Sequence, residues 1–238
     1  MISLKNLNVY VSEKQILKNI NFDFEKGKVY ALMGPNGSGK STLANILMRH
    51  PSYEIKSGKI FFEGEDITDL TVEKRAKKGI FLSFQQPLSL SGVNVFQLLR
   101  LALSGKKDPL KLKKEIETLA KKLKIKKELM ERSLNDGASG GEKKKMEVLQ
   151  AAILKPNFLI FDEVDTGVDV DALKTIASFI TEFKKERTIL MITHYNRILR
   201  YLKPDKVLVM IDGEIKKVGD HKLAEEIERE GYRIEVKS

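Results

Sequence analysis

Short runs of apolar residues alternate with amphipathic segments along most of the chain. Five of these runs have the length of a strand, and they lie at residues 29–33, 80–84, 158–162, 188–193 and 207–211. Apolar residues also recur at helical spacing, most regularly over residues 110–123 and 170–185. Strands that alternate with helices predict an α/β fold, with a mainly parallel sheet that carries helices on both faces.

Two other parts of the chain depart from this alternation. Looser apolar–polar alternation predicts added antiparallel strands at residues 2–11, 20–24 and 58–63. Glycines, prolines and helical spacing over residues 85–134 predict a helical insert. We therefore expect a core half with the antiparallel strands at 1–84, a helical subdomain at 85–134, and the remainder of the core at 135–238.

A glycine-rich loop follows the first apolar run. It fits the pattern G-x-x-x-x-G-K-[ST] and consists of Gly34, Pro35, Asn36, Gly37, Ser38, Gly39, Lys40 and Ser41. The glycines let backbone N–H groups point into one concavity, to which the following helix adds its positive end. Lys40 can reach the outer phosphates, the Ser41 hydroxyl can ligate Mg²⁺, and Thr42 is placed to help. The loop predicts a nucleoside triphosphate site; the other interpretation is an ordinary turn that caps a helix.

Two carboxylates follow the apolar run at residues 158–161. A buried strand would bring Asp162 to its carboxyl end beside the glycine-rich loop, where Asp162 can hold Mg²⁺ through its water shell. Glu163 comes next and is placed to orient or deprotonate an attacking water, which would convert binding into hydrolysis. The alternative is that Glu163 caps the next turn.

A second candidate anion site lies at Ser139, Gly140, Gly141 and Glu142. Serine is a residue type that begins helices, and two glycines leave the backbone N–H groups accessible. One chain cannot bring both this segment and the glycine-rich loop to the same phosphate. We call residues 139–142 the signature segment.

The order of these motifs resembles that of the ABC-type ATPases, which have a RecA-like core and a helical subdomain. In that family the signature motif of one subunit covers the nucleotide held by the other, so the resemblance implies an ATP-dependent, head-to-tail homodimer. It also implies that Phe84–Gln85 forms the Q-loop, with Gln85 near Mg²⁺ and the water. Residues 166–169 would form the D-loop at the dimer seam, with Asp169 near the nucleotide. His194 would contact the γ-phosphate.

The base of ATP is expected to stack on an aromatic residue of the first strand region in such proteins. Tyr10 is the candidate, although Val11 is an alternative occupant of the matching position. The other role for Tyr10 is that of a half-buried strand residue.

Within the ABC-type ATPases, the chain is similar to the SufC-type ATPases of the SUF iron–sulfur assembly system. Four stretches carry this resemblance, at residues 33–43, 139–145, 167–174 and 193–207, and the last is the most specific. The chain departs from the pattern at Ala138 and at residues 164–166. The resemblance implies partners like SufB and SufD, whose shape the ATPase changes.

Composition limits the possible functions. The chain has 238 residues, a formal net charge of +10 and no cysteine. Without thiolates it cannot supply the usual ligands of an iron–sulfur cluster, so any cluster would sit on a partner. No apolar run has the roughly 20 residues that span a bilayer, and the first residues do not form a signal sequence, which predicts a cytoplasmic protein without membrane insertion.

Three functions remain open at this point. The first is an ATPase motor of iron–sulfur cluster assembly. The second is the ATP-binding subunit of a membrane transporter, which the core motifs fit equally well. The third is a nucleic-acid machine, suggested by the basic charge; however, repair-type ABC ATPases need long coiled-coil insertions, and residues 85–134 lack sustained heptads. We therefore expect no nucleic-acid partner.

Overall fold

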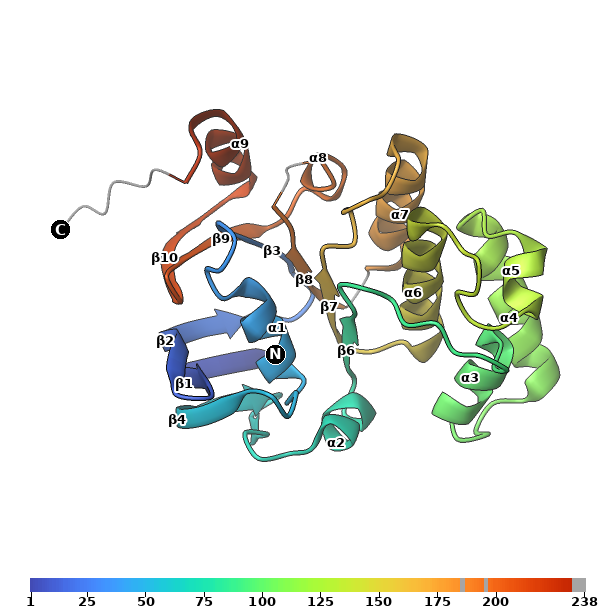
Figure 1. The fold of residues 1–238 in the computed structure, drawn as a ribbon, viewed down its shortest axis with the longest axis horizontal. Coiled ribbons are helices and arrows are strands. Elements are labelled where there is room, and N and C mark those ends of the chain that lie inside the picture. Colours follow the sequence, from blue (N-terminus) through green and yellow to red (C-terminus); the bar gives the residue numbers. More distant parts are fainter. Residues whose placement is uncertain (185–186, 195–196, 233–238) are drawn as a thin grey trace.

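Two β-sheets share one hydrophobic core in the computed structural model, which describes residues 1–184, 187–194 and 197–232. The smaller sheet has the strand order β2-β1-β4-β5, and all its pairings are antiparallel. Its strands are β1 (Ile2–Val11), β2 (Lys14–Phe24), β4 (Glu54–Phe62) and β5 (Glu65–Asp66). The predicted antiparallel additions are confirmed, and Figure 1 shows them on one side of the molecule.

The larger sheet has six strands in the order β10-β9-β3-β8-β7-β6. Five of them run parallel, and only β10 pairs antiparallel with its neighbour. The strands are β3 (Val29–Met33), β6 (Ile80–Ser83), β7 (Phe158–Asp162), β8 (Thr188–Ile192), β9 (Lys206–Ile211) and β10 (Glu214–Gly219). All five apolar runs of the sequence therefore form the predicted strands of a mainly parallel sheet.

Each face of the large sheet is buried against a different layer. In β3, Tyr30 and Leu32 pack in a core shared with α1 (Lys40–Leu47) and the antiparallel sheet. Val29, Ala31 and Met33 pack instead in a second core, formed mainly with helices. Those helices are α6 (Gly140–Leu154), α7 (Val170–Phe183), α8 (Leu199–Leu202) and α9 (His221–Glu230). Helices cover both faces as predicted, but α1 shares its face with a sheet.

The predicted helical insert consists of α3 (Val95–Ala102), α4 (Pro109–Lys122) and α5 (Lys127–Glu131). Its apolar stripe, which includes Leu112, Ile116 and Leu123, packs in the same core as the neighbouring α6. Figure 1 shows the insert at the edge of the molecule opposite the antiparallel sheet. No helix of the described residues is long and apolar enough to cross a membrane.

Nothing in the sequence indicated that Arg75, a charged residue, would be buried. It lies in α2 (Val72–Lys77) and is fully buried. Its guanidinium donates to the carbonyls of Ile46 and Leu47, at the end of α1, at 2.7 and 2.9 Å. It also donates to the carbonyls of Ile67 and Thr68, both at 2.8 Å. Burial lowers the pKa of Arg75 to about 10, so the side chain remains charged at neutral pH.

The substitution Arg75→Ala is expected to lower the free energy of unfolding by about 3 kcal/mol or more, because the carbonyls of Leu47 and Thr68 lose their donor and the fully buried side chain leaves a cavity. Urea denaturation would measure this loss. Lys74→Ala removes an exposed lysine from the same helix and should change stability by less than about 0.5 kcal/mol. Equal stabilities of the two variants would contradict the role given to Arg75.

Candidate functional site

The glycine-rich loop connects the end of β3 to the start of α1. Gly39 precedes the helix with a φ of 105°, in the region that favours glycine. Gly34 has no room for a side chain, since a Cβ atom there would lie 2.1 Å from the carbonyl oxygen of Met210 in β9. The loop is thus held against the neighbouring strand, and the N-terminus of α1 opens into it, as expected for an anion site.

Lys40 is buried at the inner side of this loop. Its Nζ donates to the carbonyl oxygens of Gly34 and Pro35 at 2.8 and 2.9 Å. Burial lowers the pKa of Lys40, while the carboxylates of Glu163 and Asp162 act in the opposite direction. The structure therefore brings the ammonium group of Lys40 close enough to the carboxylates of Asp162 and Glu163 for their charges to interact.

Asp162 ends β7 with a buried carboxyl group. Its backbone N–H donates to Ser83 Oγ at 3.1 Å. Burial raises the pKa of Asp162, and a hydrogen bond with Ser41 opposes this shift. Among the described residues its Oδ1 atom is buried without a hydrogen-bond partner. An unpartnered carboxylate oxygen beside a hydroxyl matches the oxygen ligands that Mg²⁺ prefers, so Ser41 and Asp162 could hold this ion.

Glu163 contacts the two other predicted catalytic residues. Gln85 Nε2 donates to its Oε2 at 3.0 Å, and His194 Nε2 lies 2.9 Å from its Oε1. Its backbone adopts a φ of 53°, in the left-handed region, and its N–H donates to the carbonyl of Ile192 at 2.9 Å. Among the described residues, the carboxylate of Glu163 contacts these two side chains and caps no helix or turn. The structure therefore does not support the alternative that Glu163 is a capping residue.

The signature segment forms the start of α6. Ser139 Oγ accepts from the backbone N–H of Glu142 at 3.3 Å, and Glu142 Oε2 accepts from the N–H of Ser139 at 2.9 Å. A Cβ atom at Gly141 would approach Ala172 Cβ to 3.4 Å, which places the segment beside the start of α7. No hydrogen bond or ion pair between described residues joins this segment to the glycine-rich loop.

Two further candidates take structural positions. Asp169 caps α7, since its Oδ1 accepts from the N–H of Ala172 at 2.8 Å. Tyr10 is half-buried in β1 and pairs with Gln15 and Glu54 on the adjacent strands. All of these contacts lie within the chain. That Asp169 and Tyr10 contact a nucleotide stays a prediction.

The sequence did not identify Tyr232 as a neighbour of the site. Its hydroxyl group is buried, which raises the pKa of Tyr232, and the backbone of Gly34 acts against this shift. The described chain thus ends beside the glycine-rich loop. No motif marks this residue, because the contact depends on where the tertiary structure places the end of α9.

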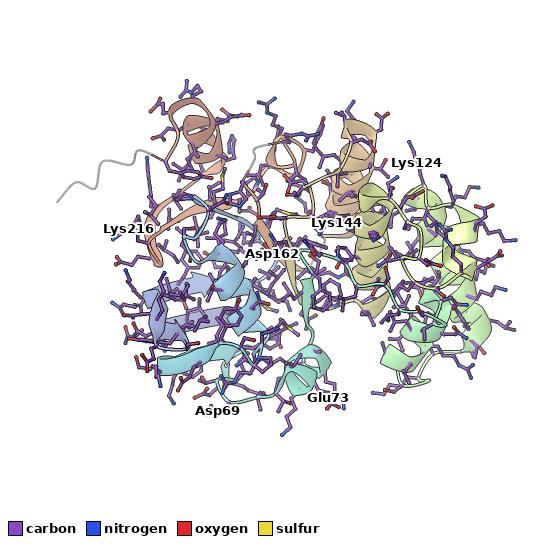
Figure 2. The ribbon with its side chains drawn as sticks, viewed as in Figure 1. Asp69, Glu73, Lys124, Lys144, Asp162 and Lys216 are labelled. Atoms are coloured by element: carbon purple, nitrogen blue, oxygen red, sulfur yellow. The ribbon has the colours of Figure 1, made fainter. Side chains whose placement is uncertain are left out.

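A buried ion pair beside Gln85 was also missed. Lys144 and Glu147 lie on α6, with Nζ and Oε2 3.7 Å apart and their side chains 5% and 6% exposed. Figure 2 shows Lys144 and Asp162 at the centre of the molecule, and their charges interact. The only signal in the sequence is the spacing of three residues, which places opposite charges on one face of a helix.

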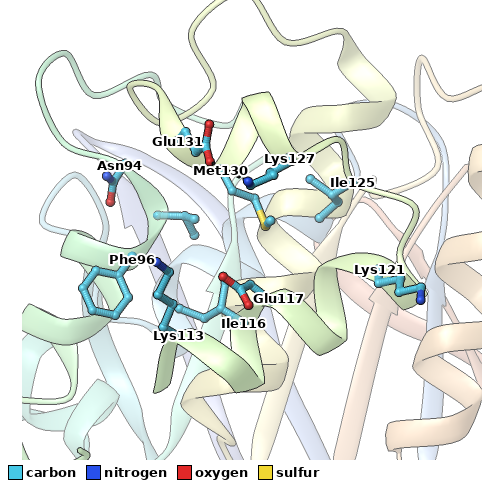
Figure 3. A pocket seen from close by; sticks show the side chains of 11 residues that line it. Asn94, Phe96, Lys113, Ile116, Glu117, Lys121, Ile125, Lys127, Met130 and Glu131 are labelled. Carbon is cyan, nitrogen blue, oxygen red and sulfur yellow. Dashed lines mark ion pairs between the residues drawn. The ribbon is translucent and has the colours of Figure 1, made fainter. Parts of the chain in front are cut away.

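A separate cavity of about 690 Å³ lies within the helical insert. Figure 3 shows Phe96, Ile116 and Met130 around it, with Lys113 and Lys127 among the charged side chains nearby. It is formed by α3, α4 and α5 and does not include the residues that surround Glu163.

The family model of the ABC transporters matches residues 17–166. A probable ATP-dependent transporter, ycf16, of Antithamnion sp. is 43% identical over 98% of this chain and 96% of its own length. The probable ATP-dependent transporter slr0075 of Synechocystis sp. is 44% identical over 98% of this chain and 94% of its own length. A probable ABC transporter ATP-binding protein of Streptococcus pyogenes is 42% identical over 98% of this chain and 93% of its own length.

Solved structures of ATP-binding cassettes have the same fold. A nucleotide-free cassette from an ABC transporter superposes with a TM-score of 0.81 and 26% identity, over 99% of this chain and 98% of its own. The dimeric cassette MJ0796, described in a post-hydrolysis state with ADP and Pi, also has a TM-score of 0.81, at 22% identity over 93% of this chain and 99% of its own. The predicted cassette fold is therefore confirmed.

Replacing the loop cation tests the site directly. Lys40→Ala is expected to abolish ATP hydrolysis, because the loop loses the point charge that holds the outer phosphates. Phosphate release under saturating MgATP would measure the loss. Lys26→Ala removes an exposed lysine ahead of β3 and should hydrolyse ATP normally. Near-normal turnover by Lys40→Ala would overturn the assignment of the loop.

Proposed function

This chain belongs to the ABC transporter family as an ATP-binding, ATP-hydrolysing P-loop protein, and we propose that it is the motor of an iron–sulfur assembly complex. Proteins of this family use ATP with Mg²⁺. The observation that carries the catalytic part is the position of Glu163, held between Gln85 and His194 directly after Asp162.

We assign each residue of the site a role in hydrolysis. The loop of residues 34–42 and Lys40 bind the phosphates, while Ser41 and Asp162 would hold Mg²⁺, with Gln85 near it. When bound, Mg²⁺ would supply positive charge opposite the phosphate oxygens. Glu163 accepts a proton from the attacking water at a carboxylate oxygen, and His194 contacts the γ-phosphate.

The signature segment completes this site in a second copy of the chain. Within one chain, the described residues provide no bond between this segment and the loop of residues 34–42. The start of α6 exposes Ser139 and Gly140, while its N-terminal N–H groups suit phosphate oxygens. A head-to-tail dimer with two nucleotides in its seam uses both half-sites, with Asp169 at the seam. The dimeric state described for the cassette MJ0796 supports this arrangement.

The proposed partners are proteins like SufB and SufD. Support comes from two stretches of the sequence, SGGEKKK at residues 139–145 and THYNRILRYLKPDKV at residues 193–207. Tyr195 and Asn196 of the second stretch lie outside the described residues. Since the chain has no cysteine, the cluster would be bound by a partner in the cytoplasm. The second candidate is a transporter subunit, which the descriptions of the curated relatives favour.

We place the partner contact on the surface around the Q-loop and the helical subdomain, residues 85–134. Phe84 and Leu88 expose 53% and 62% of their surface there, and Leu90 exposes 37%. Neighbouring apolar side chains on a surface are typical of an interaction site. A partner that binds two chains here would raise their effective concentration and stimulate hydrolysis. The subdomain boundaries at residues 84 and 134 are part of this proposal.

Isolation of the tagged chain from its own cells separates the two candidates. Co-purifying chains that resemble SufB or SufD would support the assembly function. Recovery of membrane-spanning subunits instead would establish the transporter function and overturn our proposal.

The substitution Glu163→Gln should preserve MgATP binding and slow hydrolysis about a hundredfold or more, the scale expected when a general base is lost. Steady-state turnover and nucleotide titration measure the two effects. Glu128→Gln makes the same chemical change at an exposed position of α5 and should leave both unchanged. A decrease of less than tenfold would mean that Glu163 does not act on the water.

Sedimentation of the Glu163→Gln protein tests the shared site. We expect monomers without nucleotide, because two chains of net charge +10 repel at low salt, and dimers with MgATP. Adding Ser139→Arg should prevent dimer formation by filling the phosphate position, whereas Ser178→Arg, on the exposed side of α7, should permit it. A dimer that ignores both nucleotide and Ser139→Arg would rule out the shared site.

A further inference from the structure

The Q-loop backbone is bound by two charged side chains of α6. Glu147 Oε1 accepts from the N–H of Phe84 at 2.8 Å. Lys144 Nζ donates to the carbonyls of Phe84 and Gln85, each at 2.9 Å. The pair therefore contacts both peptide oxygens and one N–H group at the point where β6 leads into the Q-loop. We call Lys144 and Glu147 the α6 clamp.

Stability alone does not account for this pair. Removing a lysine and a glutamate from water carries a large desolvation cost, and apolar residues of similar volume often stabilise a core equally well. Burial is strong enough to raise the pKa of Glu147 to about 7 and to lower the pKa of Lys144. What the two charged groups provide, and apolar side chains could not, is a set of directed hydrogen bonds to Phe84 and Gln85.

The α6 clamp binds the backbone of a residue whose side chain contacts Glu163. The backbone of Gln85 is held by Lys144, while its side chain donates to Glu163 Oε2 at 3.0 Å. Gln85 is an exposed residue, and the hydrogen bond of its side chain to Glu163 is partly buried. Hydrogen bonds from α6 thus hold the backbone of Gln85. Through Gln85, they influence one of the two side-chain contacts of Glu163.

The same helix begins at the signature segment. Glu147 lies eight residues after Ser139, a distance of about 12 Å along the axis at 1.5 Å per residue. α6 runs unbroken from Gly140 to Leu154, so a displacement at its start moves Lys144 and Glu147 with it. A helix of this kind can connect two sites rigidly.

We propose that Lys144 and Glu147 are positioning residues that tie the Q-loop of each chain to its own signature segment. This inference rests on the proposed head-to-tail dimer. There, the signature segment of one chain covers the ATP bound by the second chain, whereas Gln85 of the first chain serves the first chain's own ATP. The clamp therefore makes the Gln85–Glu163 contact at one ATP site depend on occupation of the other.

Turnover of clamp variants tests the positioning role. Lys144→Met and Glu147→Ala should each lower kcat at least about tenfold, since small displacements of catalytic groups are costly, while the Kd for MgATP changes less than about twofold. Glu147→Gln keeps an oxygen that accepts from Phe84, so it should retain at least about a third of the activity. Lys155→Met removes a lysine from the far end of the same helix and should behave as wild type.

Hydrogen exchange tests the connection between the sites and does not depend on activity. In Glu163→Gln, MgATP should slow amide exchange in the peptides that cover residues 83–87 and residues 34–43. The added substitution Lys144→Met should abolish the slowing at 83–87 alone. Adding Ser139→Arg instead of Lys144→Met should also abolish the slowing at residues 83–87 alone. In that variant ATP remains bound, but the signature segment no longer contacts the nucleotide of the second chain.

The outcomes separate this inference from the proposed function. The α6 clamp is overturned if exchange at residues 83–87 is still slowed by MgATP in the presence of either Lys144→Met or Ser139→Arg, while residues 34–43 are also slowed. That result leaves the ATPase assignment intact. A kcat within twofold of wild type for both Lys144→Met and Glu147→Ala also overturns it. If MgATP slows exchange at residues 34–43 in none of the variants, the proposed nucleotide site fails, and the inference fails with it.

Discussion

Burial of negative charge at the end of the parallel sheet is the constraint on which the site depends. Desolvation raises the pKa of Asp162 at the end of β7, of Asp165 in the buried segment that follows, and of Glu147 on the adjacent α6. A carboxyl group whose pKa is higher in the folded than in the unfolded chain destabilises the fold as the pH rises above its ordinary pKa. These three groups therefore reduce stability at neutral pH. A Mg²⁺ ion held by Asp162 would offset part of this cost, because its positive charge would lie next to the buried carboxylate.

Strand order explains why the site forms where it does. β3, β8, β7 and β6 are consecutive neighbours, and one part of the site lies at or just after the end of each. These parts are the glycine-rich loop, His194, the pair of carboxylates and Gln85. Because the strands are parallel, all four parts emerge at the same edge of the sheet, as in other open α/β folds. Ser41 and Asp162, which lie far apart in the sequence, thus meet at this edge of the sheet.

The helix α6 has two functions in this arrangement. Its first turn presents the signature segment, and its second and third turns hold the Q-loop through Lys144 and Glu147. In the proposed head-to-tail dimer, these two features of one helix would link the ATP site of one chain to that of the other.

The sequence by itself determined the elements whose signals are local. Apolar runs predicted the strands of the parallel sheet, helical spacing predicted α4 and α7, and the glycine-rich loop predicted the phosphate site, because each pattern reflects nearby backbone geometry. Tertiary structure alone decided which charged residues are buried. Arg75, Lys144 and Glu147 look like surface residues in the sequence. Their importance comes from carbonyl and amide groups distant in the chain, which reach them only when separate helices and strands pack together and exclude water.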